Sequence, residues 1–77
     1  MSVTDKVLET VAKAFGTDAS ALTLETSLLD DLRATSVNYF PIMSELEEEY
    51  DLDLQYQTFR SQCRTIGDIV RMVEAEI

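Results

Sequence analysis

Few side chains in this sequence could take part in covalent chemistry. The chain has no histidine and a single cysteine, Cys63. Without histidine it lacks the commonest general base and metal ligand, so it cannot build a Cys–His pair or a His-ligated metal centre by itself. A single cysteine also excludes an internal disulfide bond. Cys63 is expected to be a buried, inert thiol, because free cysteine packs as a small hydrophobic residue.

The acidic stretch after residue 50 does not predict a calcium site. Asp51 and Asp53 resemble the start of an EF-hand loop. That loop also needs glycine at its sixth position and a bidentate glutamate at its twelfth. Tyr56 and Gln62 stand at those positions. The sequence therefore predicts neither a metal site nor a catalytic residue of its own.

Ser36 is the remaining candidate for chemistry. It stands between a leucine-containing stretch and a segment with helical periodicity. A hydroxyl at a helix start is exposed and lies near the positive end of the helix dipole, where backbone N–H groups favour a phosphate. Serine is also a common helix N-cap. Spacing alone leaves both interpretations open, a phosphodiester-linked arm or a simple cap, and favours the cap.

A first helix is predicted by apolar residues at helical spacing from residue 3 to residue 15, with Ser2 or Thr4 as its cap and Gly16 as its stop. About twenty residues separate it from the next helical segment, which is long for a structureless loop in so small a domain. Four leucines recur through this connection, so we expect it to be held onto the core: Leu22, Leu24, Leu28 and Leu32.

A second helix is predicted from Ser36 to Tyr50. Its inward stripe is expected to consist of Phe40, Met43, Leu46 and Tyr50. Pro41 lacks an N–H and crowds the preceding helical turn, which costs about 3 kcal/mol in a helix interior but little in the first turn. We therefore expect a frayed, kinked or delayed start to this helix, with Ser36 on a less regular segment.

Two further helices are predicted after residue 54. A short one fits within residues 55–62 with Phe59 pointing inward, and a longer one is opened by Thr65, with Asp68 at the capping-box distance. No stretch alternates as a strand does. The predicted fold class is all-α: a small four-helix bundle of three longer helices and one short helix, with a long ordered loop between helices 1 and 2. Residues 1–77 are expected to form one domain.

The charge of the chain restricts its partners. Fifteen Asp and Glu residues against six Lys and Arg residues give a formal net charge of -9. That charge repels nucleic acid and anionic membranes and favours proteins with basic surfaces. No apolar run approaches the ~20 residues that a membrane-spanning helix needs, and the N-terminus has no signal-peptide pattern. We expect a cytoplasmic monomer that binds neither nucleic acid nor membrane.

The segment around Ser36 resembles the attachment region of acyl carrier proteins. Residues 31–37 read Asp-Leu-Arg-Ala-Thr-Ser-Val, where that family has an Asp-Leu-Gly-x-Asp-Ser-Leu type motif. Residues 46–51 and 65–70 are also similar to the corresponding helices of the family. The likeness covers the whole chain in length, helix order and the position of the serine. The resemblance implies a carrier domain with no catalytic site.

The resemblance implies specific roles for several residues. A phosphopantetheinyl transferase would esterify Ser36 with 4'-phosphopantetheine from coenzyme A, and the arm would hold acyl groups as thioesters. Acyl-transfer or synthase enzymes with basic docking patches would act on them. The residues expected to contact such partners are Thr35, Val37, Asn38, Glu45 and Glu48. The residues that could line an acyl pocket, although such a stripe is more commonly plain core, are Phe40, Met43, Leu46 and Phe59.

Four positions depart from the family pattern. Arg33 stands at the usual glycine, and Thr35 stands at the usual acid before the serine. Asn38 and Pro41 stand where the family often has acids. This loss of negative charge favours a specialised carrier of a fatty-acid, polyketide or related pathway over the housekeeping carrier of fatty-acid synthesis. The alternative is an unmodified, acidic protein-interaction module with a carrier-like fold.

Overall fold

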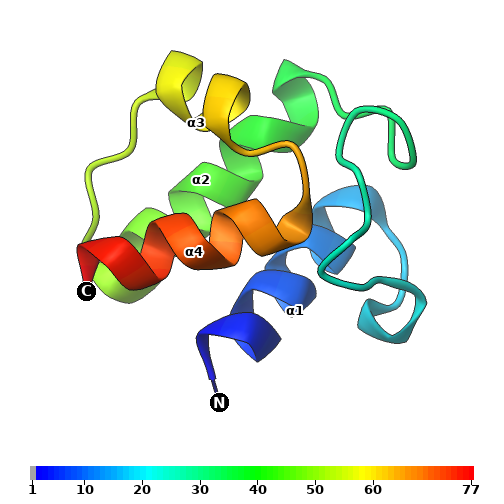
Figure 1. Ribbon diagram of the computed structural model, residues 1–77, viewed down its shortest axis with the longest axis horizontal. Helices are drawn as coiled ribbons and strands as arrows, with labels where there is room; N and C mark the ends of the chain where they lie inside the picture. The colour runs from blue at the N-terminus through cyan, green and yellow to red at the C-terminus, as the bar shows by residue number, and fades with distance from the viewer. Residues whose placement is uncertain (1) are drawn as a thin grey trace.

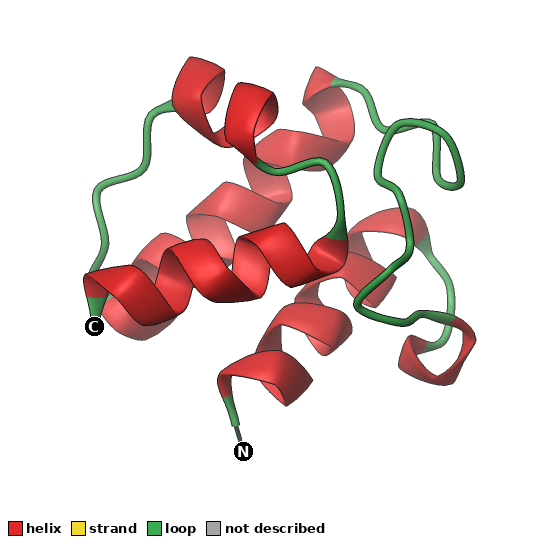
Figure 2. Ribbon diagram, in the orientation of Figure 1, coloured by secondary structure: helices red, strands yellow, loops and turns green. Residues whose placement is uncertain are grey.

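The computed structural model describes residues 2–77, which form four α-helices and one short 3-10 helix (Figure 1). The elements in chain order are α1 Val3–Phe15, η1 Ala19–Ala21, α2 Ser36–Tyr50, α3 Tyr56–Gln62 and α4 Ile66–Glu76. Figure 2 shows helices joined by loops throughout this part of the chain. The predicted all-α bundle, with three longer helices and one short helix, is confirmed. No helix within residues 2–77 is long and apolar enough to cross a bilayer.

Helix α1 begins and ends where the sequence predicts. The Ser2 side chain caps it by accepting a hydrogen bond from the backbone N–H of Asp5 at 3.1 Å. Gly16 ends it in the left-handed conformation, with φ 66° and ψ 36°, which glycine adopts without a steric penalty. Val7 and Val11 are fully buried on the face that packs against α2 and α4.

The long connection between α1 and α2 is held to the rest of the molecule by backbone hydrogen bonds. The N–H of Leu28 donates to the carbonyl of Arg64 at 2.8 Å. The N–H of Gly67 donates to the carbonyl of Leu24, also at 2.8 Å, and a Cβ at Gly67 would lie only 3.0 Å from that oxygen. Leu22 and Leu28 are buried, whereas Leu24 is exposed. The prediction of an ordered loop held onto the core is confirmed.

The last two helices also agree with the sequence. Phe59 of α3 is 1% exposed and lies in the core. Thr65 caps α4 by accepting from the N–H of Asp68, whose carboxylate accepts from the N–H of Thr65 in return. Desolvation alone would raise the pKa of Asp68, but hydrogen bonds from Thr65, Arg64 and Arg71 outweigh it and hold that pKa below its usual value.

The face that α2 turns inward differs from the predicted stripe. Phe40 is 52% exposed, so its assignment to the inward stripe is wrong, and Tyr50 is only half-buried. The buried residues of this helix are Tyr39, Ile42, Met43 and Leu46. Tyr39 takes the inward place because its ring meets the edge of the Phe59 ring, with centroids 6.0 Å apart. Both aromatic residues fit a helical stripe and both contact α3, but Tyr39 meets the buried ring of Phe59, whereas Phe40 meets the half-buried ring of Tyr56.

The start of α2 also differs from the expectation based on Pro41. The helix begins at Ser36, so the delayed start and the less regular segment are both wrong. The first turn is fixed ahead of the proline, because Tyr39 donates its N–H to the carbonyl of Thr35 at 3.0 Å and Asn38 Oδ1 accepts from the N–H of Thr35 at 3.0 Å. Pro41 then lies inside the helix, where it cannot donate to the carbonyl one turn earlier.

Candidate functional site

Ser36 is exposed and is the first residue of α2. Its interpretation as the N-cap is wrong, because Thr35 occupies that position. The side-chain hydrogen bonds of the cap join Thr35 and Asn38, whose Oδ1 accepts from both the N–H and the hydroxyl of Thr35. The hydroxyl of Ser36 is therefore not used to start the helix and is presented to solvent.

The backbone around Ser36 suits a phosphate. The N–H groups of Ser36 and Val37 precede the first helical hydrogen bond, since Asn38 and Tyr39 are the first residues to donate back to Thr35. Helix α2 is 15 residues long and has no acid in its first turn. A phosphate ester on Ser36 Oγ would lie beside two unused donors at the positive end of the helix. The residues present thus fit a phosphodiester-linked arm.

The expected partner-contact residues near Ser36 are not equally available. Val37 is 76% exposed and Thr35 is exposed, so both flank the serine hydroxyl at the surface. Asn38 is half-buried, and its amide is used within the molecule: Oδ1 completes the cap of α2 and Nδ2 donates to the carbonyl of Ala14 at 3.4 Å. Asn38 fixes α2 against α1 rather than presenting a free polar group.

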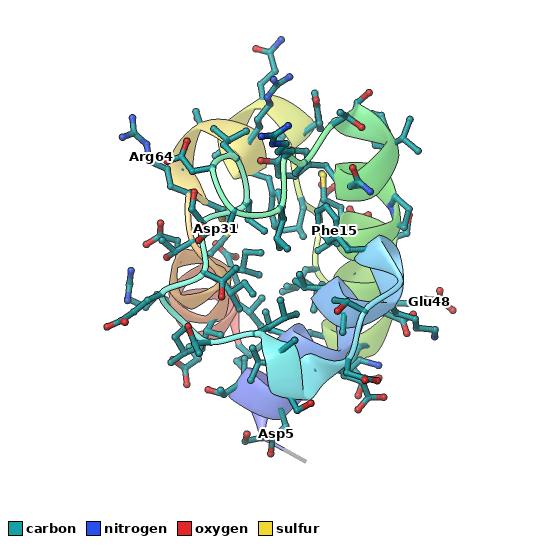
Figure 3. The ribbon with its side chains drawn as sticks, turned by 90° about the vertical axis from the view of Figure 1, so that its right-hand side faces the viewer. Asp5, Phe15, Asp31, Glu48 and Arg64 are labelled. Carbon is teal, nitrogen blue, oxygen red and sulfur yellow. The ribbon has the colours of Figure 1, made fainter. Side chains whose placement is uncertain are left out.

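The two acidic residues that are expected to contact partners, Glu45 and Glu48, have different surroundings. Glu45 points toward α1, where its carboxylate lies 3.3 Å from Lys6 Nζ and 3.8 Å from Lys13 Nζ. Desolvation alone would lower the pKa of Lys6, but Glu45 and Glu49 outweigh it and raise that pKa. Glu48 projects outward into solvent (Figure 3). Of the two, Glu48 is the acid that a partner could reach without breaking an ion pair.

The four acyl-pocket candidates do not line one cavity. Met43, Leu46 and Phe59 are buried together in the packed core. Phe40 lies outside it and stacks on the ring of Tyr56, with centroids 4.8 Å apart and an interplanar angle of 27°. Phe40 is thus separated from the three buried candidates, and an acyl pocket stays a prediction for these residues. Phe59 also lines a small groove of about 140 Å³ between α3 and α4.

Tyr39 is a residue of this region that the sequence reasoning left without a role. Its side chain is fully buried, and its hydroxyl has no hydrogen-bond partner among residues 2–77. Burial raises the pKa of this phenol. Its ring contacts those of Tyr56 and Phe59 edge-on, at 6.1 and 6.0 Å. The feature of the sequence that indicates its burial is its spacing of three and four residues from Ile42 and Met43.

Comparison with known proteins identifies the family. A family model described as the phosphopantetheine attachment site matches residues 5–73. The chain belongs to the acyl carrier protein family. The acyl carrier protein of Streptococcus pneumoniae serotype 4 is 38% identical over 76 residues, which are 99% of this chain and 97% of that protein.

Two further relatives carry the same name. The acyl carrier protein of Streptococcus thermophilus is 35% identical over 74 residues, 96% of this chain and 95% of that protein. The acyl carrier protein of Clostridium acetobutylicum is 32% identical over 73 residues, 95% and 94% of the two chains. The resemblance found in the motif around residue 36 is confirmed, and the cofactor of this carrier family is covalently attached 4'-phosphopantetheine.

The structure shows the consequence of one departure from the family motif. Arg33, at the place of the motif's glycine, has φ 53° and so adopts the left-handed conformation. Glycine enters that region freely, whereas other L-residues do so at a cost of roughly 1–2 kcal/mol. The loop of this acyl carrier protein keeps the backbone shape of the motif with a strained, cationic residue in place of glycine.

Proposed function

We propose that Ser36 Oγ is the attachment point of 4'-phosphopantetheine and that this chain carries acyl groups as thioesters on the arm. The observation that carries the proposal is the placement of an exposed hydroxyl on the first residue of α2, beside the unused N–H groups of Ser36 and Val37. A pathway of fatty-acid, polyketide or related synthesis other than the housekeeping one fits the absence of acids from the first turn of α2.

The attachment reaction needs a transferase, coenzyme A and magnesium. The serine oxygen forms a bond to the phosphorus that bears pantetheine, and the pyrophosphate bond of coenzyme A breaks. Adenosine 3',5'-bisphosphate leaves, and the serine proton passes to a base of the transferase, since this chain has no histidine to take it. The carrier contributes the exposed oxygen and the donors at the helix start, and it acts as no enzyme itself.

The core protects the thioester cargo from a competing thiol. Cys63 is 1% exposed, and burial raises its pKa to about 12. At neutral pH it is a buried thiol and not the nucleophilic thiolate, so acyl groups do not transfer from the arm to Cys63. The arm would carry the one reactive sulfur of the holo-protein.

The partners that we propose are a phosphopantetheinyl transferase and the acyl-transfer or synthase enzymes that use the loaded arm. Basic patches on these enzymes would face Glu48 and the neighbouring acids of the second half of α2, while Thr35 and Val37 would be covered beside Ser36. The chain would act as one domain, residues 1–77, as a cytoplasmic monomer without nucleic-acid or membrane contacts.

Intact-mass spectrometry after incubation with coenzyme A, magnesium and a broad-specificity transferase tests the proposal. We expect the wild type to gain one phosphopantetheine and Ser36→Ala to gain none. Ser44→Ala, an exposed serine of the same helix, is the matched control and should be modified like the wild type. Modification of Ser36→Ala would disprove the assignment. If the wild type stays unmodified in this reaction and also lacks the arm when isolated from its host, the function is that of an unmodified interaction module.

A further inference from the structure

The loop that leads into α2 carries an arginine in a strained conformation. Arg33 is exposed and has φ 53°, in the left-handed region. Its place is fixed by the residue that follows, since Ala34 is buried and donates its N–H to the carbonyl of Leu28 at 2.8 Å. A residue other than glycine is strained in this region, and such strain is concentrated at functional sites. The side chain that is kept in spite of the strain lies three residues before Ser36.

The guanidinium of Arg33 has no acidic partner within residues 2–77. None of the ion pairs there includes it. The two acids closest to it in the sequence are Asp30 and Asp31, and Asp31 Oδ2 accepts instead from the N–H of Ser27 at 2.7 Å. In a chain with fifteen acids, the N–H donors of Arg33 thus remain available for an acidic group of another molecule.

The chain around Ser36 is otherwise uncharged. Residues 32–44 contain no Asp or Glu, and Arg33 is their only charged residue, whereas four glutamates follow in the second half of α2. Val37 is 76% exposed and Phe40 is 52% exposed. The cores of protein interfaces are depleted in Asp, Glu and Lys and enriched in aromatic residues and Arg. The first half of α2 and its loop have the composition of such a core, and the second half has that of an acidic rim.

Helix α3 extends the apolar surface beside Ser36. Phe40 lies one helical turn after Ser36 and therefore on the same face of α2. Its ring stacks on Tyr56 of α3, and Figure 1 shows α3 beside the start of α2. Three residues span at most about 11 Å, and a standard interface of about 800 Å² on each partner is much wider than that. An enzyme that reaches Ser36 Oγ therefore covers Arg33 together with the aromatic pair.

We infer that the transferase that modifies Ser36 carries an acidic side chain that pairs with Arg33, within an apolar surface that covers Val37 and Phe40. The inference rests on the attachment of the arm at Ser36. A guanidinium offers paired N–H donors that match the two oxygens of a carboxylate. A transferase with a basic residue at this point is repelled by Arg33, so Arg33 also selects among transferases. The phosphate of the arm does not account for Arg33 at this step, because it is absent when the transferase first meets the chain.

The kinetics of attachment test the inference with charge variants of Arg33. Each phosphopantetheinyl transferase of the host is purified and supplied with coenzyme A and magnesium, and intact mass follows the product with time. For the enzyme that modifies the wild type fastest, we expect Arg33→Gln to lower kcat/KM about tenfold and Arg33→Glu to lower it further. A higher salt concentration should reduce both differences, because salt screens the attraction. Arg33→Lys keeps the charge and should retain most of the activity.

Two variants separate the charge of Arg33 from its other effects. Arg33→Gly removes the charge and relieves the strain, so it should lose kcat/KM like Arg33→Gln without a lower midpoint of urea denaturation. Arg71→Gln removes the same charge from an exposed site of α4 and should keep the wild-type kcat/KM. An unchanged kcat/KM in Arg33→Gln overturns the inference. So does an equal loss in Arg71→Gln, which would assign the effect to the net charge of the chain.

A carbodiimide identifies the acid of the transferase. This reagent joins a lysine amine to a carboxylate that lies in contact with it. It is applied to Arg33→Lys combined with Ser36→Ala, which prevents turnover, in the presence of the transferase and coenzyme A. We expect the introduced lysine to be linked to an Asp or Glu of the transferase, as peptide mass spectrometry shows. A link to acids of this chain alone would overturn the inference, because position 33 would then have an internal partner.

The two proposals can fail separately. A wild type that no transferase modifies at Ser36 contradicts the proposed function and the inference with it. A wild type that is modified at Ser36 no faster than Arg33→Gln contradicts the inference alone.

Discussion

Phe40 and Tyr56 stack at the surface with ring centroids 4.8 Å apart, and this pair joins the start of α2 to α3. One residue earlier, the Tyr39 ring is directed into the core and meets Tyr56 and Phe59 edge-on. The two neighbouring aromatic residues of α2 therefore both contact α3, Tyr39 from the core and Phe40 at the surface. The outer pair lies within one turn of Ser36, so α3 is fixed beside the attachment residue.

The exposure of Phe40 predicts a small effect for its removal. We expect Phe40→Ala to lower the free energy of unfolding by about 1 kcal/mol, because Phe40 is itself half-exposed and a stacked aromatic pair contributes about 0.5–1.5 kcal/mol. Met43→Ala, which empties a buried site, should cost about 3 kcal/mol. Urea denaturation measures both, with the highly exposed Val37→Ala as control. Equal losses for Phe40→Ala and Met43→Ala would place Phe40 in the core after all.

Pro41 predicts a gain in stability on substitution. Pro41→Ala restores an N–H that can donate to the Val37 carbonyl and removes a steric contact worth about 3 kcal/mol in a helix interior. The unfolded chain of the variant has a higher conformational entropy, which reduces this gain in the free energy of unfolding by about 1 kcal/mol. The net expectation is a gain of about 2 kcal/mol in the free energy of unfolding, measured by urea denaturation. Ser44→Ala in the same helix is the control, and a less stable Pro41→Ala would contradict the reading.

Both ends of α1 and the start of α4 could be predicted because their determinants are local. Ser2, Gly16 and Thr65 act on backbone groups within a few residues of themselves, and each stands where the sequence placed it. The inward face of α2 could not be predicted. The choice between Tyr39 and Phe40 depends on how each ring meets aromatic rings of α3, which lie further along the chain. Periodicity treats two adjacent aromatic residues as equal candidates.

The site shows the same division between local and distant determinants. The place of Ser36 at the start of a helix followed from the pattern around it, and the family comparison confirmed the resemblance. The pairing of Glu45 with Lys6, 39 residues earlier, did not follow, nor did the backbone bond from Leu28 to Arg64. Both depend on how α1 and the α3–α4 connection pack against the rest of the chain.

The orphan hydroxyl of Tyr39 predicts that its removal is harmless. An unpaired buried hydroxyl costs about 1 kcal/mol or more, so Tyr39→Phe should leave the free energy of unfolding unchanged or raise it by about 1 kcal/mol. The edge-on ring contacts remain in this variant. Tyr56→Phe is the matched control and should lose the bond from Arg60. A loss of stability in Tyr39→Phe would show that the hydroxyl has a partner in solution.

Cys63 predicts a characteristic dependence of stability on pH. Burial raises its pKa from 9.0 to about 12, so the folded chain holds the thiol proton at pH values where the unfolded chain has lost it. The contribution of Cys63 is constant below pH 9 and is lost as the pH rises from 9 to 12. Urea denaturation of the wild type and of Cys63→Ala over this range should show a steeper fall for the wild type. Parallel curves would mean that the thiol titrates normally.

Thiol-reactive reagents give a second readout. At pH 8 the native apo-protein should show no reactive thiol, and the native holo-protein should show one, the thiol of the arm.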